Sequence, residues 1–263
     1  MSKVVKILSW NVNGIRAVSK KDALWPLVEK ESPDIVCLQE TKISSEGDFP
    51  KDLRMQNYEL LLSRSKEKKG YSGVAILSKV KPLYVKKGFG IEKFDVEGRV
   101  LEAGFDEFIL FSVYFPNGKM SQERLDYKME FYEKFREYVE FLRQAGKRVV
   151  ICGDVNTAHE EIDLARPKEN VDVSGFLKME RDWISHFLAL GWFDSLRELH
   201  PGEEGLYTWW AQRAIGARER NVGWRIDYFF LSESLREYLK DAFILPQYKG
   251  SDHCPLGVVL SFD

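Results

Sequence analysis

Several apolar runs of this sequence are bordered by side chains that can bind a cation or move a proton. Four runs meet such groups, which are Asn11 with Asn13, Glu40, Asp154 with Asn156, and Asp252 with His253. A fifth run carries Asp227 at its start. Carboxylate and amide oxygens are hard ligands that suit Mg²⁺ or Mn²⁺, and neither Cys nor His occurs in a zinc-binding spacing. A magnesium or manganese site with one His beside it predicts phosphoryl chemistry, in which a carboxylate orients or deprotonates water.

Each of these residues also has a purely structural interpretation. Asp154 could form only a turn with the residues after it, although the other clusters favour a role in a shared site. Glu40 follows a fully apolar run, which favours function over a plain surface position. Asp227 lies between apolar residues, where a buried charge needs a partner, and His253 is suitable because a carboxylate favours protonated imidazole. Tyr114 ends another run, and on its own it would be a core or rim aromatic.

These groups can meet only if the runs form strands whose ends lie together. Apolar runs predict strands at 4–10, 34–38, 58–63, 73–77, 82–87, 100–105, 108–114, 149–152, 226–231, 242–245 and 256–260, with a short candidate at 207–210. Helices are predicted at 22–30, with Asp22 as a candidate N-cap, at 121–145 and at 179–190, and loops at 160–174 and 211–224. Many strands and few helices favour one α/β domain spanning 1–263. We expect a four-layer α/β sandwich, in which two mixed β-sheets pack face to face with helices outside.

The segment after residue 206 is basic and aromatic. It combines four Arg and three Trp residues: Arg213, Arg218, Arg220, Arg225, Trp209, Trp210 and Trp224. Such a segment can bind phosphates through its cations and stack on sugars or bases through its rings. Lys66, Lys68 and Lys69, just before Tyr71, offer a second contact of this kind. The alternative is a solvated loop whose Trp side chains belong to the core.

The bulk composition limits the classes of protein further. The net charge of −2 gives no global basic field, so a polyanion must be bound by local patches. No apolar run reaches transmembrane length and the N-terminus lacks a signal-peptide pattern, so we expect no membrane partner and a cytoplasmic location. Cys37, Cys152 and Cys254 lie in or beside apolar runs and are expected to be free thiols. Nothing indicates an association helix, so a monomer is expected.

Seven motifs resemble, in the same order and over nearly the whole chain, those of the exonuclease III-type apurinic/apyrimidinic (AP) endonucleases. They are Ser9–Gly14, Leu38–Lys42, Gly70–Gly73, Tyr114–Asn117, Gly153–Asn156, Asn221–Tyr228 and Gly250–Pro255. The Ser-Asp-His motif alone recurs across the wider endonuclease/exonuclease/phosphatase superfamily, whereas the combination is specific. The segments His159–Leu164 and Asn221–Tyr228 distinguish this family from the inositol phosphatases and sphingomyelinases that share the fold.

The resemblance implies roles for the residues at the strand ends. Glu40 resembles the principal Mg²⁺ ligand, with Asn13 and Asp252 close by, and Mn²⁺ is an alternative metal. Asp154 resembles the residue that activates or orients the attacking water, with Asn156 beside it. The remaining matches are to groups around the scissile phosphate: His253 paired with Asp227, Tyr114 and Asn11.

The resemblance also implies a DNA-contacting surface. The positions that match DNA contacts or supports of the site are Tyr71, Arg99, Asn117 and Asn170, and the basic loop adds Arg213 and Arg220. Trp209, Trp224 and Ile226 match an apolar pocket that receives a flipped-out abasic deoxyribose, because a nucleotide without its base has less stacking to lose.

The implied activity is DNA repair by Mg²⁺-dependent hydrolysis of the backbone 5′ to abasic sites in double-stranded DNA. The products would be a 3′-hydroxyl and a 5′-deoxyribose phosphate. A 3′→5′ exonuclease or 3′-phosphodiesterase side activity, and incision at other lesions, are further expectations. Some departures from the family pattern touch substrate preference: Asn13 stands where some relatives carry Asp, Val173 where some carry Asn, and Trp209 where others carry Phe. The alternatives are a small-molecule or lipid phosphatase on the same fold, and a non-catalytic DNA-binding module.

Overall fold

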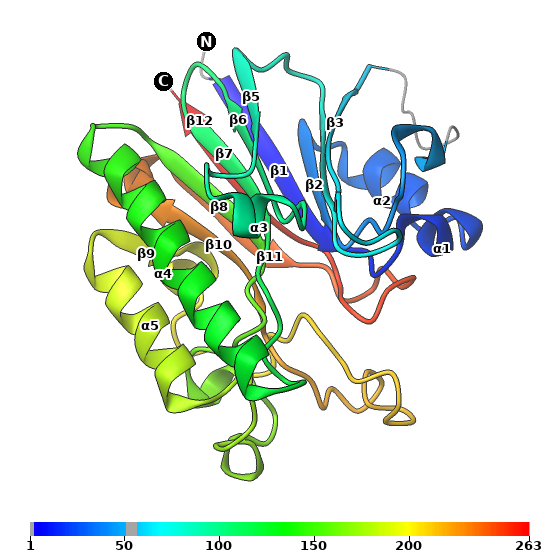
Figure 1. Cartoon of the computed structure of the whole chain (residues 1–263), viewed down its shortest axis with the longest axis vertical. Coiled ribbons are helices and arrows are strands. Elements are labelled where there is room, and N and C mark those ends of the chain that lie inside the picture. The colour runs from blue at the N-terminus through cyan, green and yellow to red at the C-terminus, as the bar shows by residue number, and fades with distance from the viewer. Residues whose placement is uncertain (1–2, 51–56, 263) are drawn as a thin grey trace.

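The structure, a computed structural model, describes residues 3–50 and 57–262, and its strands form two six-stranded sheets (Figure 1). Sheet A contains, in spatial order, β11 (Leu239–Ile244), β12 (Leu256–Phe262), β1 (Lys3–Asn11), β2 (Ile35–Gln39), β4 (Val74–Ser78) and β3 (Glu59–Ser63). Sheet B contains β5 (Tyr84–Lys87), β6 (Val100–Gly104), β7 (Ile109–Tyr114), β8 (Val149–Asp154), β10 (Asp227–Ser232) and β9 (Trp192–Asp194). Both sheets are mixed, because β1 runs parallel to β2 and β7 runs parallel to β8, while the other pairs are antiparallel.

The helices cover the outer faces of the two sheets. Sheet A is flanked by α1 (Ile15–Lys20) and α2 (Leu24–Glu31), and sheet B by α4 (Gln122–Gln144) and α5 (Lys178–Ala189) (Figure 1). Shorter elements join the strands: α3 (Glu92–Asp95), α6 (Ser195–Leu199), η1 (Glu46–Asp48), η3 (Glu161–Asp163), η4 (Pro167–Glu169) and η5 (Glu233–Tyr238). No helix in the described ranges is long and apolar enough to cross a membrane.

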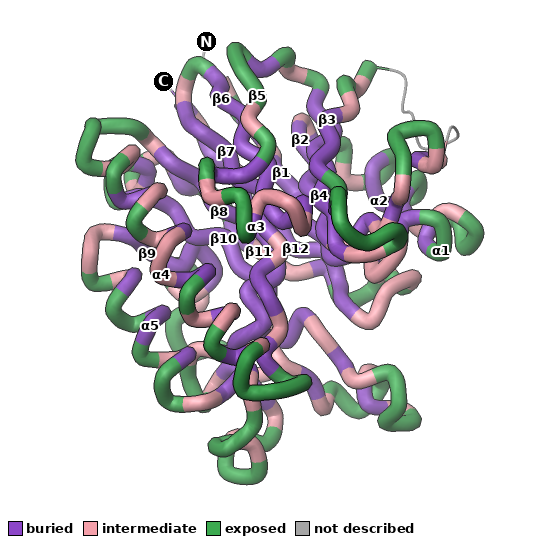
Figure 2. The backbone as a smooth tube through the Cα atoms, in the orientation of Figure 1, coloured by how far each residue is buried: buried purple, intermediate pink, exposed green. Residues whose placement is uncertain are grey.

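Three apolar layers hold these elements together, and they confirm the predicted four-layer sandwich. The layer between the sheets joins side chains such as Ile7 and Cys37 of sheet A to Val150 and Phe229 of sheet B. A second layer packs sheet B against α4 and α5, and a third packs sheet A against α1 and α2. The central strands are therefore buried on both faces, which explains why they read as continuous apolar runs (Figure 2).

One small polar layer interrupts the packing between the sheets. Gln39 at the end of β2 donates from Nε2 to the hydroxyl of Ser9 at 3.1 Å and to the hydroxyl of Ser112 on sheet B at 3.2 Å. All three side chains are fully buried, so each polar group needs these partners. The bonds tie β1, β2 and β7 together at the last residue of β2 and two residues before the ends of β1 and β7.

The predicted elements match the structure except at several short or irregular segments. The second helix begins at Leu24 with Ala23 as its N-cap, so the prediction of Asp22 as the cap is wrong. The long helix α4 is capped as predicted, by a hydrogen bond from the backbone N–H of Arg124 to the hydroxyl of Ser121. The candidate strand at 207–210 is reduced to isolated bridges from Trp209 to Trp224 and His253. The sequence patterns did not predict α1, α3, α6 or β9.

Candidate active site

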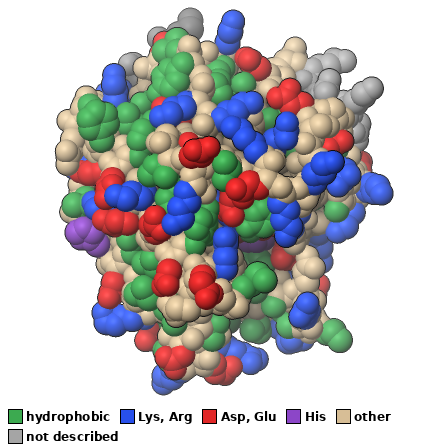
Figure 3. Space-filling view, in the orientation of Figure 1, with side chains coloured by type: hydrophobic (Ala, Val, Ile, Leu, Met, Phe, Trp, Pro, Cys, Tyr) green, Lys and Arg blue, Asp and Glu red, His purple; other side chains and the backbone are tan. Residues whose placement is uncertain are grey.

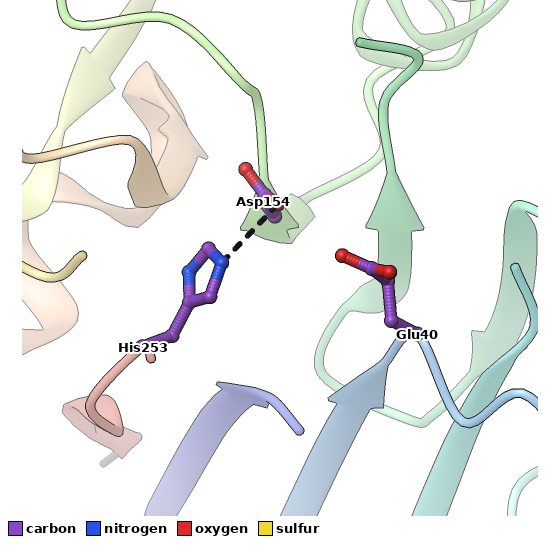
Figure 4. Close-up of side chains that lie close together, drawn as sticks. All are labelled: Glu40, Asp154 and His253. Carbon is purple, nitrogen blue, oxygen red and sulfur yellow. Dashed lines mark ion pairs between the residues drawn. The ribbon is translucent and has the colours of Figure 1, made fainter. Parts of the chain in front are cut away.

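The polar strand ends of the two sheets meet at one side of the sandwich. Asn11, at the end of β1, donates from Nδ2 to Glu40 Oε1 at 2.9 Å and to Asp154 Oδ2 at 2.8 Å. Glu40 follows β2 and Asp154 ends β8, as Figure 4 shows. The Asn11 amide therefore joins groups from both sheets. The parallel pairs β1–β2 and β7–β8 bring these ends together, since parallel strands end at the same edge.

The backbone turns sharply where these side chains leave the strands. Asn13, Glu40 and Asn156 have φ values of 45°, 50° and 57°, which lie in the left-handed region that non-glycine residues seldom adopt. Gly153 has a φ of 138°, and a Cβ there would lie 1.9 Å from the carbonyl oxygen of Val113. Only glycine therefore allows β8 to approach β7 this closely just before Asp154.

His253 and Asp227 form a buried pair beside Asp154. His253 Nδ1 lies 2.8 Å from Asp227 Oδ2, and its Nε2 lies 3.8 Å from Asp154 Oδ2. The hydroxyl of Thr208 donates to the same Asp227 oxygen at 2.7 Å, which fixes the carboxylate. Burial alone would lower the pKa of His253, but Asp227 and the other nearby carboxylates outweigh it and raise that pKa to about 10. His253 is therefore a protonated donor at neutral pH.

The surroundings of Asp154 disfavour its charged form, whereas those of His253 favour the charged form. Burial raises its pKa to about 7, Asp227 and Glu40 add to the effect, and the charge on His253 opposes it. Its Oδ1 accepts the backbone N–H of Asn156 at 2.8 Å, which holds the carboxylate toward the centre of the site. A carboxylate with a pKa near neutrality is suited to exchange a proton with water.

The same carboxylates can hold a metal ion. Ligand atoms of Glu40, Asp154 and His253 lie within 4.8 Å of one another. Lys42 already places a positive charge 3.0 Å from Glu40 Oε2, which indicates that this end of the site attracts a cation. The resemblance implied a different set, Glu40 with Asn13 and Asp252. Asn13 and Asp252 lie next to this group but bond to each other, from Asn13 Nδ2 to Asp252 Oδ1 at 2.9 Å.

A cavity of about 280 Å³ opens beside the cluster of polar groups. Glu40, Asp154, Asn156, Asp252 and His253 form its polar side, and the rest of its lining is Asn117, Lys119, Gly175, Trp209, Trp224 and Ile226. The two indole rings lie edge to face, with centroids 6.3 Å apart. The ammonium of Lys119 lies 5.2 Å and 5.3 Å from these two ring centroids, so a cation covers an otherwise aromatic wall.

Arg99 supports the site from inside the protein. Its side chain is enclosed, with the residue 2% exposed, and its guanidinium donates to Tyr71 Oη at 2.6 Å and to the carbonyl oxygen of Tyr114 at 3.1 Å. Glu97 is its ionic partner. Of the two roles that the resemblance implied for Arg99, the contacts of the enclosed guanidinium with two tyrosines favour support of the site, and a DNA contact stays a prediction. Asn117, the other predicted contact nearby, donates to Asn156 Oδ1 at 2.9 Å.

Besides Tyr71 and Arg99, three further predicted DNA-contacting residues do not line the cavity. Asn170 donates its amide to the carbonyl oxygen of Arg166 at 2.7 Å in the turn after η4. Arg213 and Arg220 are exposed on the 211–224 loop, outside the residues that line the cavity. Their roles stay predictions, because a bound duplex would extend beyond the cavity.

Arg225 was grouped with the DNA-contacting arginines of the basic loop, and the structure corrects this interpretation. Its side chain is fully buried and donates to Asp163 from Nε at 2.8 Å and to Asp194 from Nη1 at 2.6 Å. Arg218 is likewise engaged by three backbone carbonyl groups, those of Ser251, Pro246 and Tyr248. These two arginines anchor the loop to the rest of the protein.

The sequence interpretation missed several residues that the structure places in or under the site. Lys119 follows Asn117 in a strand-end loop, and this position alone was a usable signal. Lys128 lies on the apolar stripe of α4, where a charge indicates a buried partner, and it pairs with Glu180 at 2.6 Å. The ammonium also donates to the carbonyl oxygen of Asn156 at 2.8 Å. No local pattern identifies Thr208, because its role depends on distant Asp227.

The fold and the arrangement of these groups define a known family. The model of the Endonuclease/Exonuclease/phosphatase family matches residues 8–253, and the chain belongs to this family. The exodeoxyribonuclease of Bacillus subtilis (strain 168) is 46% identical over 257 residues, which are 98% of this chain and 100% of that protein. The DNA repair nuclease APEX1 of Danio rerio is 46% identical over 260 residues, which are 98% of this chain and 82% of that protein.

Solved structures agree with these relatives. An AP endonuclease from Leishmania major matches with a TM-score of 0.89 at 32% identity, covering 99% of this chain and 89% of that one. The 3′ phosphatase NExo from Neisseria, bound to a product DNA hairpin, matches with a TM-score of 0.88 at 30% identity, covering 98% and 99%. These matches confirm the predicted fold and the resemblance to the exonuclease III-type AP endonucleases, and the chain is a nuclease-type hydrolase.

Proposed function

We propose that this chain is a DNA-repair phosphodiesterase that cuts the backbone of double-stranded DNA 5′ to abasic sites. The observation that carries the proposal is the joint arrangement of Asn11, Glu40 and Asp154 beside the protonated pair of His253 and Asp227, open to an aromatic cavity. The products are a 3′-hydroxyl and a 5′-deoxyribose phosphate. The names of the relatives support a nuclease that acts in DNA repair.

Each side chain of the site has a separate role in the proposed hydrolysis. Asp154 orients a water molecule for attack on phosphorus, and its pKa of about 7 allows it to accept a proton from that water. His253 donates to a phosphate oxygen and balances the charge that develops there, while Asp227 keeps it protonated. Asn11 holds Glu40 and Asp154 at a fixed separation. Tyr114, which is paired with Asp154 across β7 and β8, is expected to border the same phosphate.

The donor set fits a hard divalent cation, and we propose Mg²⁺. Glu40 would hold it, with Asp252 and Asn13 contributing from the adjoining side, while Asp154 is left to orient the water. Bound there, the ion supplies positive charge that stabilises the phosphate and the leaving oxygen. The attraction of Lys42 to Glu40 supports a cation at this end. Oxygen ligands also suit Mn²⁺, which we expect to replace Mg²⁺.

The cavity supports the choice of an abasic nucleotide as the substrate. Its volume of about 280 Å³ and its walls of Trp209, Trp224 and Ile226 suit a compact, mostly apolar sugar turned out of the helix. An abasic nucleotide costs little to turn out, because it has no base to unstack. Lys119 at the rim provides a cation for an adjacent phosphate.

The test compares matched duplexes that carry an abasic site, a uracil, a 3′ blocking group or no lesion. We expect fastest cleavage at the abasic site, loss of cleavage in EDTA, and recovery with Mg²⁺. Asp154→Asn should slow single-turnover cleavage by about 100-fold or more, which is the usual contribution of a general base. Asp182→Asn, at an exposed ion pair on α5, is the matched control. Cleavage by Asp154→Asn within about twofold of the parent would reject the role of Asp154.

A second activity at 3′ ends uses the same groups. The Neisseria neighbour is named as a 3′ phosphatase, which supports a 3′→5′ exonuclease or 3′-phosphodiesterase activity here. Faster removal of the 3′ block than cleavage at the abasic site would make this the main activity. Incision at the uracil duplex would add other lesions to the substrates. A monomeric state and a cytoplasmic location stay predictions.

A further inference from the structure

Asp252 lies between the Glu40 end of the site and the indole of Trp209. Both of its carboxylate oxygens accept hydrogen bonds from uncharged donors. Asn13 Nδ2 donates to Oδ1 at 2.9 Å, and Trp209 Nε1 donates to Oδ2 at 3.1 Å. Asn13 also accepts a hydrogen bond from Lys42, whose ammonium lies 3.0 Å from Glu40 Oε2. A continuous chain of polar contacts therefore runs from Glu40 to the indole of Trp209, which forms one wall of the cavity.

The main chain around Asp252 strengthens this connection. The backbone N–H of Trp210 donates to the carbonyl oxygen of Asp252 at 3.0 Å, and Trp209 is bridged to His253. The side-chain bond from the indole therefore closes a small ring of contacts between the two segments. Trp224 packs edge to face against Trp209 in the same aromatic lining, and no hydrogen bond joins it to Asp252 in the described part of the chain.

We propose that Asp252 is a positioning residue that couples the cation site to the wall of the substrate cavity. The proposal rests on the proposed function only in taking the Glu40 end of the site as the place of the cation. A cation near Asp252 competes with the N–H of Trp209 for the same carboxylate charge. Occupancy of the cation site therefore changes the contact that fixes the indole, and by linkage a ligand that fixes the indole changes the cation affinity by the same factor.

The side-chain types favour coupling over simple packing. A phenylalanine at position 209 would keep an aromatic ring in the wall, but it has no N–H to reach Asp252. Asn13 supplies a neutral donor to Oδ1, beside a second one from the hydroxyl of Ser251 at 3.2 Å, where a carboxylate in place of Asn13 would repel Asp252. The three side chains that donate to Asp252, those of Asn13, Trp209 and Ser251, thus hold its charge without neutralising it.

The first test measures Mn²⁺ binding to the DNA-free full chain by calorimetry. Trp209→Phe frees one carboxylate oxygen, so Mn²⁺ should bind about tenfold more tightly, the factor that one hydrogen bond to a charged group provides. Trp224→Phe removes the adjoining indole, which makes no hydrogen bond to Asp252, and should leave the Kd within about twofold of the parent. Equal Kd values for the two variants would overturn the coupling. Absence of Mn²⁺ binding to the parent would overturn the cation site itself.

The second test follows the indole N–H signals by NMR during a Mg²⁺ titration of the DNA-free chain. The signal of Trp209 is assigned by its loss in Trp209→Phe, and that of Trp224 by its loss in Trp224→Phe. We expect the Trp209 signal to shift with the Kd of Mg²⁺ and to shift more than the Trp224 signal. A Trp209 signal that does not respond, or that moves no more than Trp224, contradicts the proposal. Neither test contains DNA, so the coupling can fail while the nuclease activity holds.

Discussion

The buried ion pairs of Asp163 give the sharpest test of how the site is supported. Asp163 is 1% exposed and accepts hydrogen bonds from Arg225 Nε at 2.8 Å and from Arg197 Nη2 at 2.7 Å. Burial would raise the pKa of Asp163, but the charge and hydrogen bonds of Arg225 outweigh it and lower that pKa from an ordinary 3.8 to about 2. At about 1.4 kcal/mol for each pKa unit, the ionised carboxylate stabilises the fold by about 2.5 kcal/mol.

Asp163→Asn should therefore lower the free energy of unfolding by about 2.5 kcal/mol or more at pH 7, because Arg225 also loses its main buried partner. The pKa is depressed in the folded state, so this stabilisation is present above the unfolded pKa near 3.8 and is lost as the pH falls toward about 2. The difference between the parent and the variant should shrink over this window. Urea unfolding, followed by tryptophan fluorescence at pH 7, 4 and about 2.5, measures it.

Asp182→Asn is the matched control for this prediction. Asp182 pairs with Lys178 in one turn of α5, but both side chains are exposed, at 59% and 86%. An exposed pair of this kind should change the unfolding free energy by less than about 0.5 kcal/mol. The reasoning is refuted if Asp163→Asn costs no more than Asp182→Asn, or if its cost is the same at pH 7 and below pH 3.

Three further predictions follow from individual contacts. Arg99→Met should lower the unfolding free energy by about 3 kcal/mol and slow single-turnover cleavage, because Tyr71 and Tyr114 lose their shared donor. Cleavage at nearly the parental rate would contradict this prediction. Arg213→Ala should reduce the slope of log Kd for duplex DNA against log salt by about one, with unchanged urea unfolding, if this exposed residue contacts a phosphate. Lys128→Met should lower the free energy of unfolding in urea by about 3–5 kcal/mol, because it leaves the buried carboxylate of Glu180 without its ionic partner. An unfolding free energy equal to that of the parent would exclude a stabilising role for this ion pair.

The sequence predicted most of the sheet architecture because burial on both faces leaves a clear local pattern. The runs that became β1, β2 and β8 are apolar at successive positions, and their polar ends share an edge once the strands pair in parallel. The short elements were missed for the same reason. Helix α1 has six residues and only two buried ones, Ile15 and Val18, which is too few for a periodic pattern.

The partners of buried charges could not be predicted from the sequence, since each depends on contacts between distant segments. Arg225 has the residue type and the neighbours of a DNA contact. Its guanidinium nevertheless binds Asp163 and Asp194, which lie 62 and 31 positions away. Asp252 presented a similar difficulty. Its motif indicates a site residue, but the donor that binds its second oxygen lies 43 positions away on Trp209.

The surface around the site also shows why net charge was a poor guide to the substrate. The chain carries a net charge of −2, and positive and negative side chains are mixed over the face that Figure 3 shows. Cations near the cavity, such as Lys42 and Lys119, act over a few ångströms and are partly balanced by carboxylates. A polyanion is then held by local arrangement and not by the overall field.

The division of the site between the two sheets makes the nuclease dependent on their association. Sheet A and the segments that adjoin it supply Asn11, Glu40 and His253, while sheet B supplies Asp154 and Asp227. Neither sheet alone holds a water-orienting carboxylate together with the opposing cation and imidazole. A newly made or partly folded chain therefore lacks a complete active site, and DNA cleavage begins only after the packing between the sheets is complete.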